Sequence, residues 1–217
     1  MKAIPFRTDA EASAALAQVV GHMQGGGLLA YPTETVYGLG SRPFEADVRA
    51  LAELKGRAAG KPFLLLVADQ EMAEAQGLAF NESARALARA FWPGPLTLVL
   101  PGGSGRLPDV LRGPEGGFAV RWTSQPQMVR LVAALGLPLT STSANLPGTA
   151  PAPGADAILH DFADAVERGT LLVLDGGVLG NRPPSTVVDC TTRMPRLVRV
   201  GALSLAQLRA GAGILAP

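Results

Sequence analysis

The sequence holds few of the residues that usually carry nucleophilic catalysis or metal binding. Its 217 residues include one cysteine and two histidines. A single cysteine excludes a disulfide framework within the chain and a cysteine cluster with metal-ligand spacing. His22 and His160 fall within predicted helices and have no cysteine or carboxylate at a ligand spacing, so we interpret them as ordinary helical residues. A Ser/His or Cys/His mechanism therefore has little support.

Excess charge and long apolar runs are scarce as well. The formal net charge of +1 excludes a heavily basic coat that would drive non-specific nucleic-acid binding, and leaves local basic patches open. No apolar run reaches the roughly 18 residues that span a bilayer, and the N-terminus lacks the apolar core of a signal peptide. Together with the lone cysteine, these absences predict a soluble, cytoplasmic protein with no membrane partner.

Apolar residues make up 47% of the chain, enough for a sizeable core, and we expect a single domain over residues 1–217. Predicted helices and strands alternate along the chain, and the last strands are joined too tightly for crossover helices. This pattern predicts an α/β fold with an open, twisted, mixed sheet flanked by helices. Helices are predicted at 8–23, 48–56, 82–91, 127–135, 155–168 and from 204, and strands at 28–31, 63–67, 96–100, 118–122, 137–141, 171–174, 186–188 and 197–200.

Glycine and proline are concentrated in residues 101–117, which also contain Arg106 and Arg112. Such a composition is typical of a surface loop. We therefore expect a mobile, basic segment without regular structure. Glycines 102, 103 and 105 lack the following Lys-Ser/Thr of a P-loop, and no Gly-x-Gly-x-x-Gly opens a helix, so no standard nucleotide fingerprint is present.

Four polar segments lie at the ends of predicted strands and helices. Residues 31–37 read Tyr-Pro-Thr-Glu-Thr-Val-Tyr between an apolar strand and a Gly-Leu-Gly sequence. Lys55-Gly56-Arg57 ends a helix, Ser143-Ala144-Asn145 follows a strand, and Pro184-Ser185-Thr186 precedes one. Strands that end in glycine and polar side chains are typical of ligand sites. The sequence predicts that these four segments converge on one site.

Cations and hydroxyls are the groups that remain for chemistry. Lys55 and Arg57 suit phosphate binding, although the pair would also complement the dipole of a helix C-terminus. Arg121 lies inside an apolar strand, where it needs a bound anion or a structural carboxylate partner because an unpaired buried charge is costly. The hydroxyls of residues 140–143 and the amide of Asn145 either bind a ligand or make local backbone turns.

In combination, these segments closely resemble the YrdC-like family of threonylcarbamoyl-AMP synthases. The resemblance covers nearly the whole chain, and its specificity comes from many motifs that occur in order. They are residues 31–40 (YPTETVYGLG), Lys55-x-Arg57, residues 92–97 (WPGPLT), Ala119-Val120-Arg121, Ser143-Ala144-Asn145, residues 185–189 (STVVD) and Arg199-x-Gly201.

The resemblance implies a YrdC-like fold in its short form, without the extra C-terminal domain of longer relatives. It implies a nucleotidyltransferase that joins L-threonine, bicarbonate and ATP into threonylcarbamoyl-AMP and releases pyrophosphate. The product serves the synthesis of N6-threonylcarbamoyladenosine (t6A37) in tRNA. Implied partners are a downstream threonylcarbamoyl transferase complex and, as an open question, tRNA itself.

The family motifs also imply roles for individual residues. Thr33, Arg121 and Ser185 are expected to bind L-threonine, with Arg121 on its carboxylate. Mg²⁺ is expected to be held mainly by the ATP phosphates, since no compact carboxylate cage is visible and no metal site on the protein is expected. ATP binding is expected from Lys55, Arg57, Ser143, Asn145 and Arg199, with Lys55 and Arg57 as the catalytic pair.

Three departures from the family pattern limit the site detail. Ala58 stands where a proline usually follows Lys-x-Arg. Arg121-Trp122-Thr123-Ser124-Gln125 stands where the family commonly has Arg-x-Pro with a nearby histidine, so the sequence differs at Trp122–Gln125. Gly117 stands where a threonine is often found, so we expect no ATP contact there. Two other functions are weighed: a non-catalytic RNA-binding module, which the near-neutral charge disfavours, and a carbamoyl-adenylate-forming relative.

Overall fold

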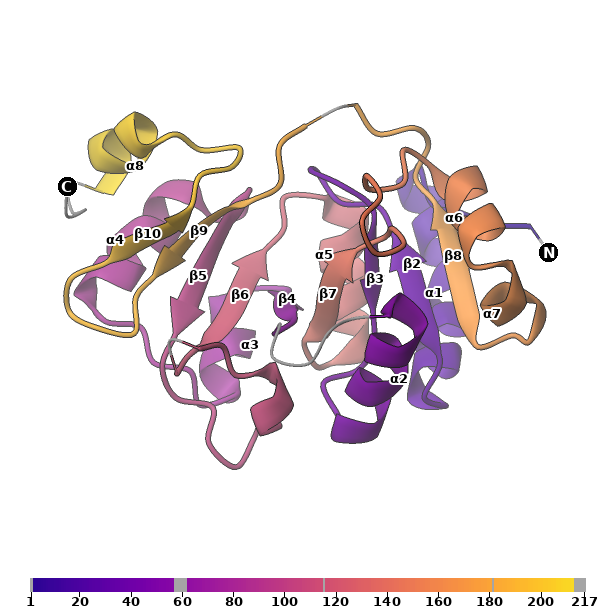
Figure 1. Ribbon diagram of the computed structural model, residues 1–217, viewed down its shortest axis with the longest axis horizontal. Coiled ribbons are helices and arrows are strands. Elements are labelled where there is room, and N and C mark those ends of the chain that lie inside the picture. Colours follow the sequence, from indigo (N-terminus) through magenta and orange to yellow (C-terminus); the bar gives the residue numbers. More distant parts are fainter. Residues whose placement is uncertain (1, 57–61, 115, 181, 213–217) are drawn as a thin grey trace.

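The computed structural model describes residues 2–56, 62–114, 116–180 and 182–212. Within these residues the strands form one ten-stranded sheet in the order β1-β8-β2-β3-β7-β4-β6-β5-β9-β10 (Figure 1). Parallel and antiparallel pairs are mixed, as predicted: β4 pairs with β6 in parallel and with β7 antiparallel. The strands are β1 (Ile4–Pro5), β2 (Leu28–Tyr31), β3 (Gly38–Gly40), β4 (Leu64–Val67), β5 (Leu96–Leu100), β6 (Phe118–Trp122), β7 (Leu139–Ser143), β8 (Leu171–Asp175), β9 (Thr186–Asp189) and β10 (Arg196–Arg199).

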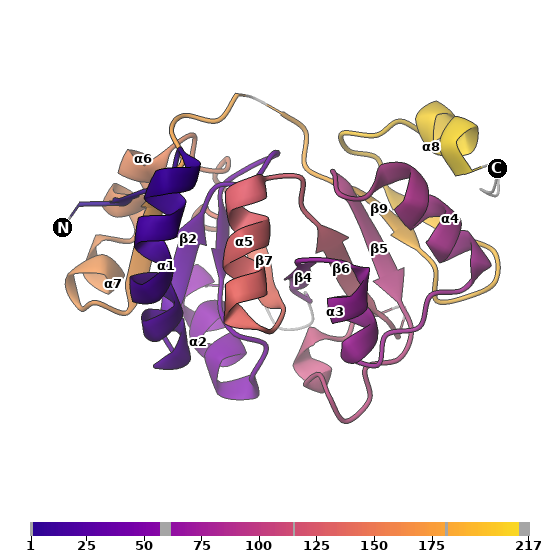
Figure 2. The same ribbon diagram turned by 180° about the vertical axis from the view of Figure 1, so that it is seen from behind.

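Helices cover both faces of the sheet. Helices α1 and α5 lie side by side over one face in Figure 2, whereas α2, α6 and α7 lie in front of the other face in Figure 1. The helices are α1 (Asp9–Gln24), α2 (Glu45–Lys55), α3 (Gln70–Ala75), α4 (Glu82–Phe91), α5 (Pro126–Leu135), α6 (Ala155–Asp161), α7 (Ala163–Glu167) and α8 (Leu205–Ala212), with a 3-10 turn, η1, at Asp109–Leu111.

Two hydrophobic cores follow from this arrangement. In β4, Leu65 and Val67 join the core that includes the inner sides of α2 and α4, whereas Leu66 joins the core under α1 and α5. Successive side chains of a strand point to opposite faces, so a strand covered on both sides must be apolar throughout. The continuous apolar run at 63–67 has this origin.

Local signals place several helix ends where the sequence predicts them. The Thr8 hydroxyl accepts from the Glu11 N–H (3.2 Å), and the Glu11 carboxylate accepts from the Thr8 N–H (2.8 Å), which completes the expected capping box at the start of α1. Helix α2 ends at Gly56, whose φ of 58° lies in the left-handed region that glycine adopts most easily.

Other expectations were wrong in detail. The single helix predicted at 155–168 is two helices, because the backbone leaves helical geometry at Phe162 (φ −120°, ψ 29°). The strand predicted at 137–141 runs from Leu139 to Ser143 and so includes more of the hydroxyl-bearing residues. Pro138 lies before the strand, since it has no N–H to donate to a ladder. Strands β1 and β3 and helix α3 were not predicted, because each is short and lacks a clear period.

Residues 101–117 are more structured than their composition predicts. They include the 3-10 turn η1 at Asp109–Leu111. The guanidinium of Arg112 lies 4.5 Å from the centroid of the Phe118 ring, and Arg106 donates to the carbonyl of Ala75 (2.5 Å). The expectation of a wholly irregular loop was therefore wrong, and both arginines contact the fold.

Close packing of Tyr31 on β3 holds the centre of the sheet together. Tyr31 is fully buried and its hydroxyl donates to the carbonyl of Thr140 (3.2 Å). A Cβ on Gly40 would lie 2.2 Å from that same carbonyl oxygen and 2.9 Å from the Tyr31 ring. Because Gly40 has no side chain, the Tyr31 ring and the backbone of β7 can pack closely against β3. No described helix is long and apolar enough to cross a membrane.

We predict opposite effects for alanine at two glycines. Gly40→Ala should lower the free energy of unfolding by about 1–3 kcal/mol, because overpacking displaces neighbouring groups. Gly21→Ala, in α1 with nothing within 4 Å of its Cβ position, should raise it by about 0.5–1 kcal/mol. Urea denaturation measures both. Equal stability of the two variants would contradict the packing described for β3.

Candidate active site

A cavity of about 940 Å³ lies across the middle of the sheet, at the upper end of the range of about 300–1,000 Å³ common for ligand pockets. It is lined by residues of β3, β4, β5, β6, β7, β9 and β10 and of the segments that follow β2, β7 and β8. Of the residues predicted from the sequence, five line this cavity together: Thr33, Arg121, Ser143, Ser185 and Arg199.

The turn after β2 is organised by one hydroxyl. Thr33 Oγ1 accepts from the N–H groups of Thr35 (3.2 Å) and Val36 (3.3 Å), and it lies 2.7 Å from the Val36 carbonyl. Thr33 Oγ1 also lies 3.0 Å from Thr35 Oγ1. Because the single hydroxyl hydrogen serves one acceptor at a time, much of the hydrogen-bonding capacity of Thr33 maintains the turn at the cavity wall.

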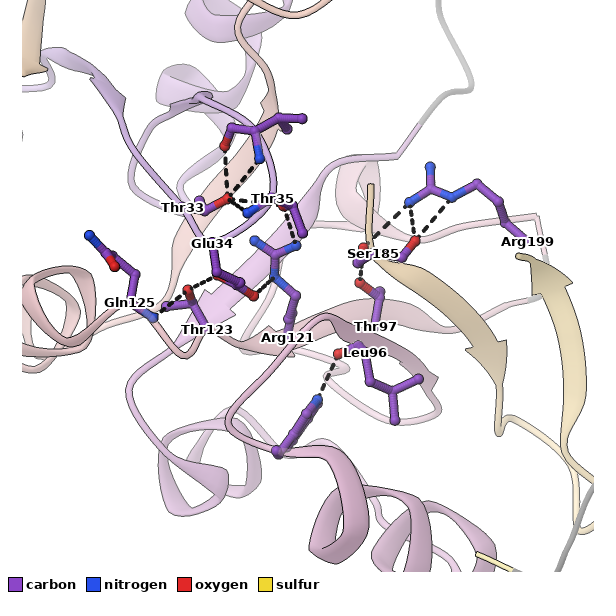
Figure 3. A network of polar contacts seen from close by, with 12 residues as sticks. Thr33, Glu34, Thr35, Leu96, Thr97, Arg121, Thr123, Gln125, Ser185 and Arg199 are labelled. Carbon is purple, nitrogen blue, oxygen red and sulfur yellow. Dashed lines mark hydrogen bonds and ion pairs between the residues drawn. The ribbon is translucent and has the colours of Figure 1, made fainter. Parts of the chain in front are cut away.

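Arg121 contacts the protein through Nε and Nη1 and also lines the cavity. Its side chain is 4% exposed, its Nε lies 3.8 Å from Glu34 Oε1, and its Nη1 donates to Thr35 Oγ1 (3.3 Å). Thr123 donates to the other oxygen of Glu34 (Figure 3). The sequence left open whether Arg121 pairs with an anion or with a carboxylate, and Glu34 is the carboxylate partner.

A second arginine enters the cavity from β10. Arg199 donates to the Ser185 carbonyl (2.8 Å), and the Ser185 hydroxyl lies 2.8 Å from that of Thr97. Burial, and then the positive charge of Arg121, lower the pKa of the Arg199 guanidinium. Two partly desolvated cations on one cavity create a positive potential that suits an anion.

Thr97 is a cavity residue that the sequence analysis did not single out. Leu98 pairs with Val120 in the antiparallel β5 and β6, so Thr97 lies beside Arg121 across the strands. Its side chain is 3% exposed, and its hydroxyl interacts with Ser185. A threonine within the otherwise apolar run 96–100 was the available signal, because a buried hydroxyl needs a partner.

Lys55, Ser143 and Asn145 form a second polar group next to the cavity. Lys55, 6% exposed, donates to the Asn145 carbonyl and to its Oδ1 (2.6 Å). Ser143 donates to the same Oδ1 (2.6 Å), while Asn145 Nδ2 donates to the Thr149 carbonyl (2.7 Å). The structure therefore brings together three of the residues expected to bind one ligand. Arg57 and Ala58 lie outside the described residues.

Two departures from the family pattern have structural consequences. A Cβ on Gly117 would lie 2.5 Å from Thr191 Cγ2 and 2.8 Å from the Leu100 carbonyl, so a threonine there would require neighbouring groups to move. Thr123, in the position where the resemblance suggests a proline, supplies the hydroxyl that donates to Glu34. No ATP contact was expected at Gly117, and Gly117 is absent from the cavity lining.

The polar lining consists of hydroxyls and guanidiniums. Among the residues that the structure describes, no group of three or more histidine, cysteine, aspartate or glutamate side chains could hold a metal ion. Hydroxyls and cations are poor ligands for a resident Mg²⁺, which prefers carboxylates and phosphates. This donor set fits an anionic ligand.

Comparisons with known proteins show the family of the chain. A family model described as telomere recombination, which groups the Sua5, YciO and YrdC proteins, matches residues 22–201. The chain belongs to the Sua5/YciO/YrdC family. This result and the sheet described above confirm the expected family and fold class.

Individual relatives extend the match. The chain is 36% identical over 189 residues to the threonylcarbamoyl-AMP synthase of Pyrococcus abyssi, covering 87% of this chain and 54% of that protein. It is 40% identical over 172 residues to the synthase of Thiobacillus denitrificans, covering 79% and 88%. The crystal structure of P. abyssi Sua5 complexed with L-threonine superposes with a TM-score of 0.86 at 33% identity, over 99% of this chain and 62% of that one. The chain thus spans little more than half the length of the P. abyssi relative.

We predict that Asn145 is a stabilising link in the group around Lys55. Asn145→Ala should lower the free energy of unfolding by about 1–3 kcal/mol, because it removes an oxygen that accepts from a buried ammonium and from a hydroxyl. Ser143→Ala, which removes one of these two donors, should cost less. Urea denaturation of both variants measures the difference, and an Asn145→Ala variant as stable as the parent would contradict this arrangement.

Proposed function

We propose that the protein is a threonylcarbamoyl-AMP synthase, which joins L-threonine, bicarbonate and ATP and releases pyrophosphate for t6A37 synthesis. The observation that carries the proposal is the pair of arginines, buried Arg121 and more exposed Arg199, that line one cavity in a member of this family. Relatives named for this activity and a Sua5 structure with L-threonine support it.

L-Threonine is proposed to bind beside β6. Its carboxylate would pair with the edge of Arg121 that lines the cavity, since a guanidinium matches a carboxylate through two parallel hydrogen bonds. Ser185, next to Thr97 and Arg199, would supply a hydroxyl to the same ligand. Thr33 would shape the wall through the turn that it organises.

ATP is proposed to occupy the part of the cavity near β7 and α2. Lys55, Arg57, Ser143, Asn145 and Arg199 would bind it, with the cations on the phosphates. Lys55 and Arg57 are proposed as the catalytic pair. Mg²⁺ would enter with the ATP phosphates and offset part of their charge, and no protein ligand is assigned to it.

The chemistry then needs no nucleophile from the protein. The amine of threonine attacks the carbon of bicarbonate, and loss of water gives a carbamate. A carbamate oxygen attacks the α-phosphorus of ATP, and the bond from that phosphorus to the bridging oxygen breaks as pyrophosphate leaves. Holding the two anions in line between Arg121 and Arg199, and stabilising the charge that develops, would supply most of the rate increase.

The proposal includes a cellular setting. The product would pass in the cytoplasm to a separate threonylcarbamoyl transferase complex, and a direct contact with tRNA would be local, because the net charge is only +1.

The direct test is product analysis. Purified protein is incubated with ATP, Mg²⁺, bicarbonate and a panel of amino acids, and adenylates and pyrophosphate are followed by mass spectrometry. We expect threonylcarbamoyl-AMP and pyrophosphate only when L-threonine and bicarbonate are both present. Folded protein that gives neither product would overturn the proposal, and a salt titration of tRNA affinity would then test the RNA-binding alternative. A carbamoyl adenylate formed without threonine would favour the other alternative.

A matched pair of variants on α2 tests the proposed catalytic role of Lys55. Lys55→Met retains much of the aliphatic stem and should lower kcat/KM at least about a hundredfold, as loss of one charge-stabilising donor does. Arg49→Met changes a cation on the same helix whose side chain is 70% exposed and paired with Glu45, and should leave kcat/KM unchanged. Circular dichroism checks the fold of both, and equal activity of the two variants would refute the assignment of Lys55.

A further inference from the structure

A largely buried carboxylate, that of Glu34, lies next to Arg121 and is not among the residues that line the cavity. The side chain of Glu34 is 12% exposed and that of Arg121 is 4% exposed. Their facing atoms, Glu34 Oε1 and Arg121 Nε, are 3.8 Å apart, and both are buried without a hydrogen-bond partner. Buried polar atoms of this kind are rare and need an explanation.

Thr123 determines where the Glu34 carboxylate points. Thr123 is fully buried, two residues after Arg121. Its hydroxyl oxygen accepts from the Gln125 N–H (3.2 Å), and its single hydrogen goes to the second oxygen of Glu34. Figure 3 shows this chain of contacts from Gln125 through Thr123 and Glu34 to Arg121. The carboxylate is thus held from one side, at a distance that gives Arg121 charge compensation without a direct hydrogen bond.

The 3.8 Å distance between Glu34 Oε1 and Arg121 Nε affects the orientation of the Arg121 guanidinium. Arg121 also faces the positive charge of Arg199, which would push an uncompensated guanidinium away from the shared cavity. The Glu34 charge lies near Nε, and Thr35 accepts from Nη1. A guanidinium has five N–H donors in a rigid fork, so fixing it at these two points fixes the direction of those that remain.

We infer that Glu34 and Thr123 are positioning residues for Arg121: the Thr123 hydroxyl holds Glu34, and Glu34 holds the guanidinium in the orientation that receives a substrate carboxylate. Neither residue is among those that line the cavity. The inference rests on the proposed function only for the identity of that carboxylate as L-threonine. The claim that Glu34 and Thr123 orient the Arg121 guanidinium does not depend on the proposed function.

The test compares Thr123→Val, which removes the hydroxyl at nearly constant volume, with Thr123→Ser, which keeps it. Thr170→Val is the matched control, because its hydroxyl donates to the Ala165 carbonyl (3.0 Å) and Thr170 is absent from the cavity lining. Nitrogen-15 relaxation of the Arg121 Nε–H signal, assigned by its loss in Arg121→Lys, reports the order of the guanidinium without any ligand. Calorimetric titrations with L-threonine and with ATP report binding.

We expect Thr123→Val to disorder the Arg121 Nε–H and to weaken L-threonine binding at least about tenfold, the effect of losing a hydrogen bond to a charged group. ATP affinity should change less than about twofold, and Thr123→Ser and Thr170→Val should behave like the parent. Glu34→Gln should resemble Thr123→Val. Because Glu34→Gln also removes a buried charge, the Thr123 pair decides the outcome if that variant does not fold.

The remaining outcomes distinguish the positioning role of Glu34 and Thr123 from the proposed binding of L-threonine. An Arg121 signal as ordered in Thr123→Val as in the parent overturns the positioning role, whatever the ligand. Equal losses of threonine and ATP affinity also overturn it, because a general structural defect predicts them. A parent protein that binds no L-threonine, with Arg121 disordered in Thr123→Val alone, refutes the proposed substrate and supports the positioning role.

Discussion

The charge of Arg121 within an apolar strand is the constraint on which the candidate site depends. An unpaired guanidinium at this depth would carry a large desolvation cost. Glu34 and Thr35, from the turn after β2, offset this cost, and Arg121 also lines the cavity. The turn after β2, strand β6 and the cavity are therefore coupled through the charge of Arg121. A substitution in any of them changes the electrostatic environment of this guanidinium.

Sheet order is what brings this unit together with the other polar segments. Strands β8 and β9 follow one another in the chain and lie far apart in the sheet, as Figure 1 shows. Strand β9 pairs with β5, which brings Ser185 to Thr97 and, through β10, Arg199 to the same cavity. At the other side, β3 and β7 pair through Gly38 and Ser143. The cavity is thus bounded by segments as far apart in the sequence as Thr33 and Arg199.

The cations at the site have different partners within the protein. Lys55 donates to the carbonyl oxygen and to Oδ1 of Asn145. Arg121 has a carboxylate nearby at a distance longer than a hydrogen bond. A cavity lined by two guanidiniums, those of Arg121 and Arg199, is suited to bringing together two anions, which would otherwise repel one another.

Composition, caps and ordered motifs determine much of this protein. The capping box of α1, the end of α2 at Gly56, the mixed sheet and the polar segments around Thr33, Ser143 and Ser185 are readable from the sequence, because each depends on local chemistry or a short period. The tertiary structure alone decided that Glu34 is the partner of Arg121, that Thr123 holds Glu34 and that Thr97 belongs to the site. Those contacts join residues that are far apart in the sequence, and which residues meet depends on the order and register of the strands in the sheet, which no single segment determines.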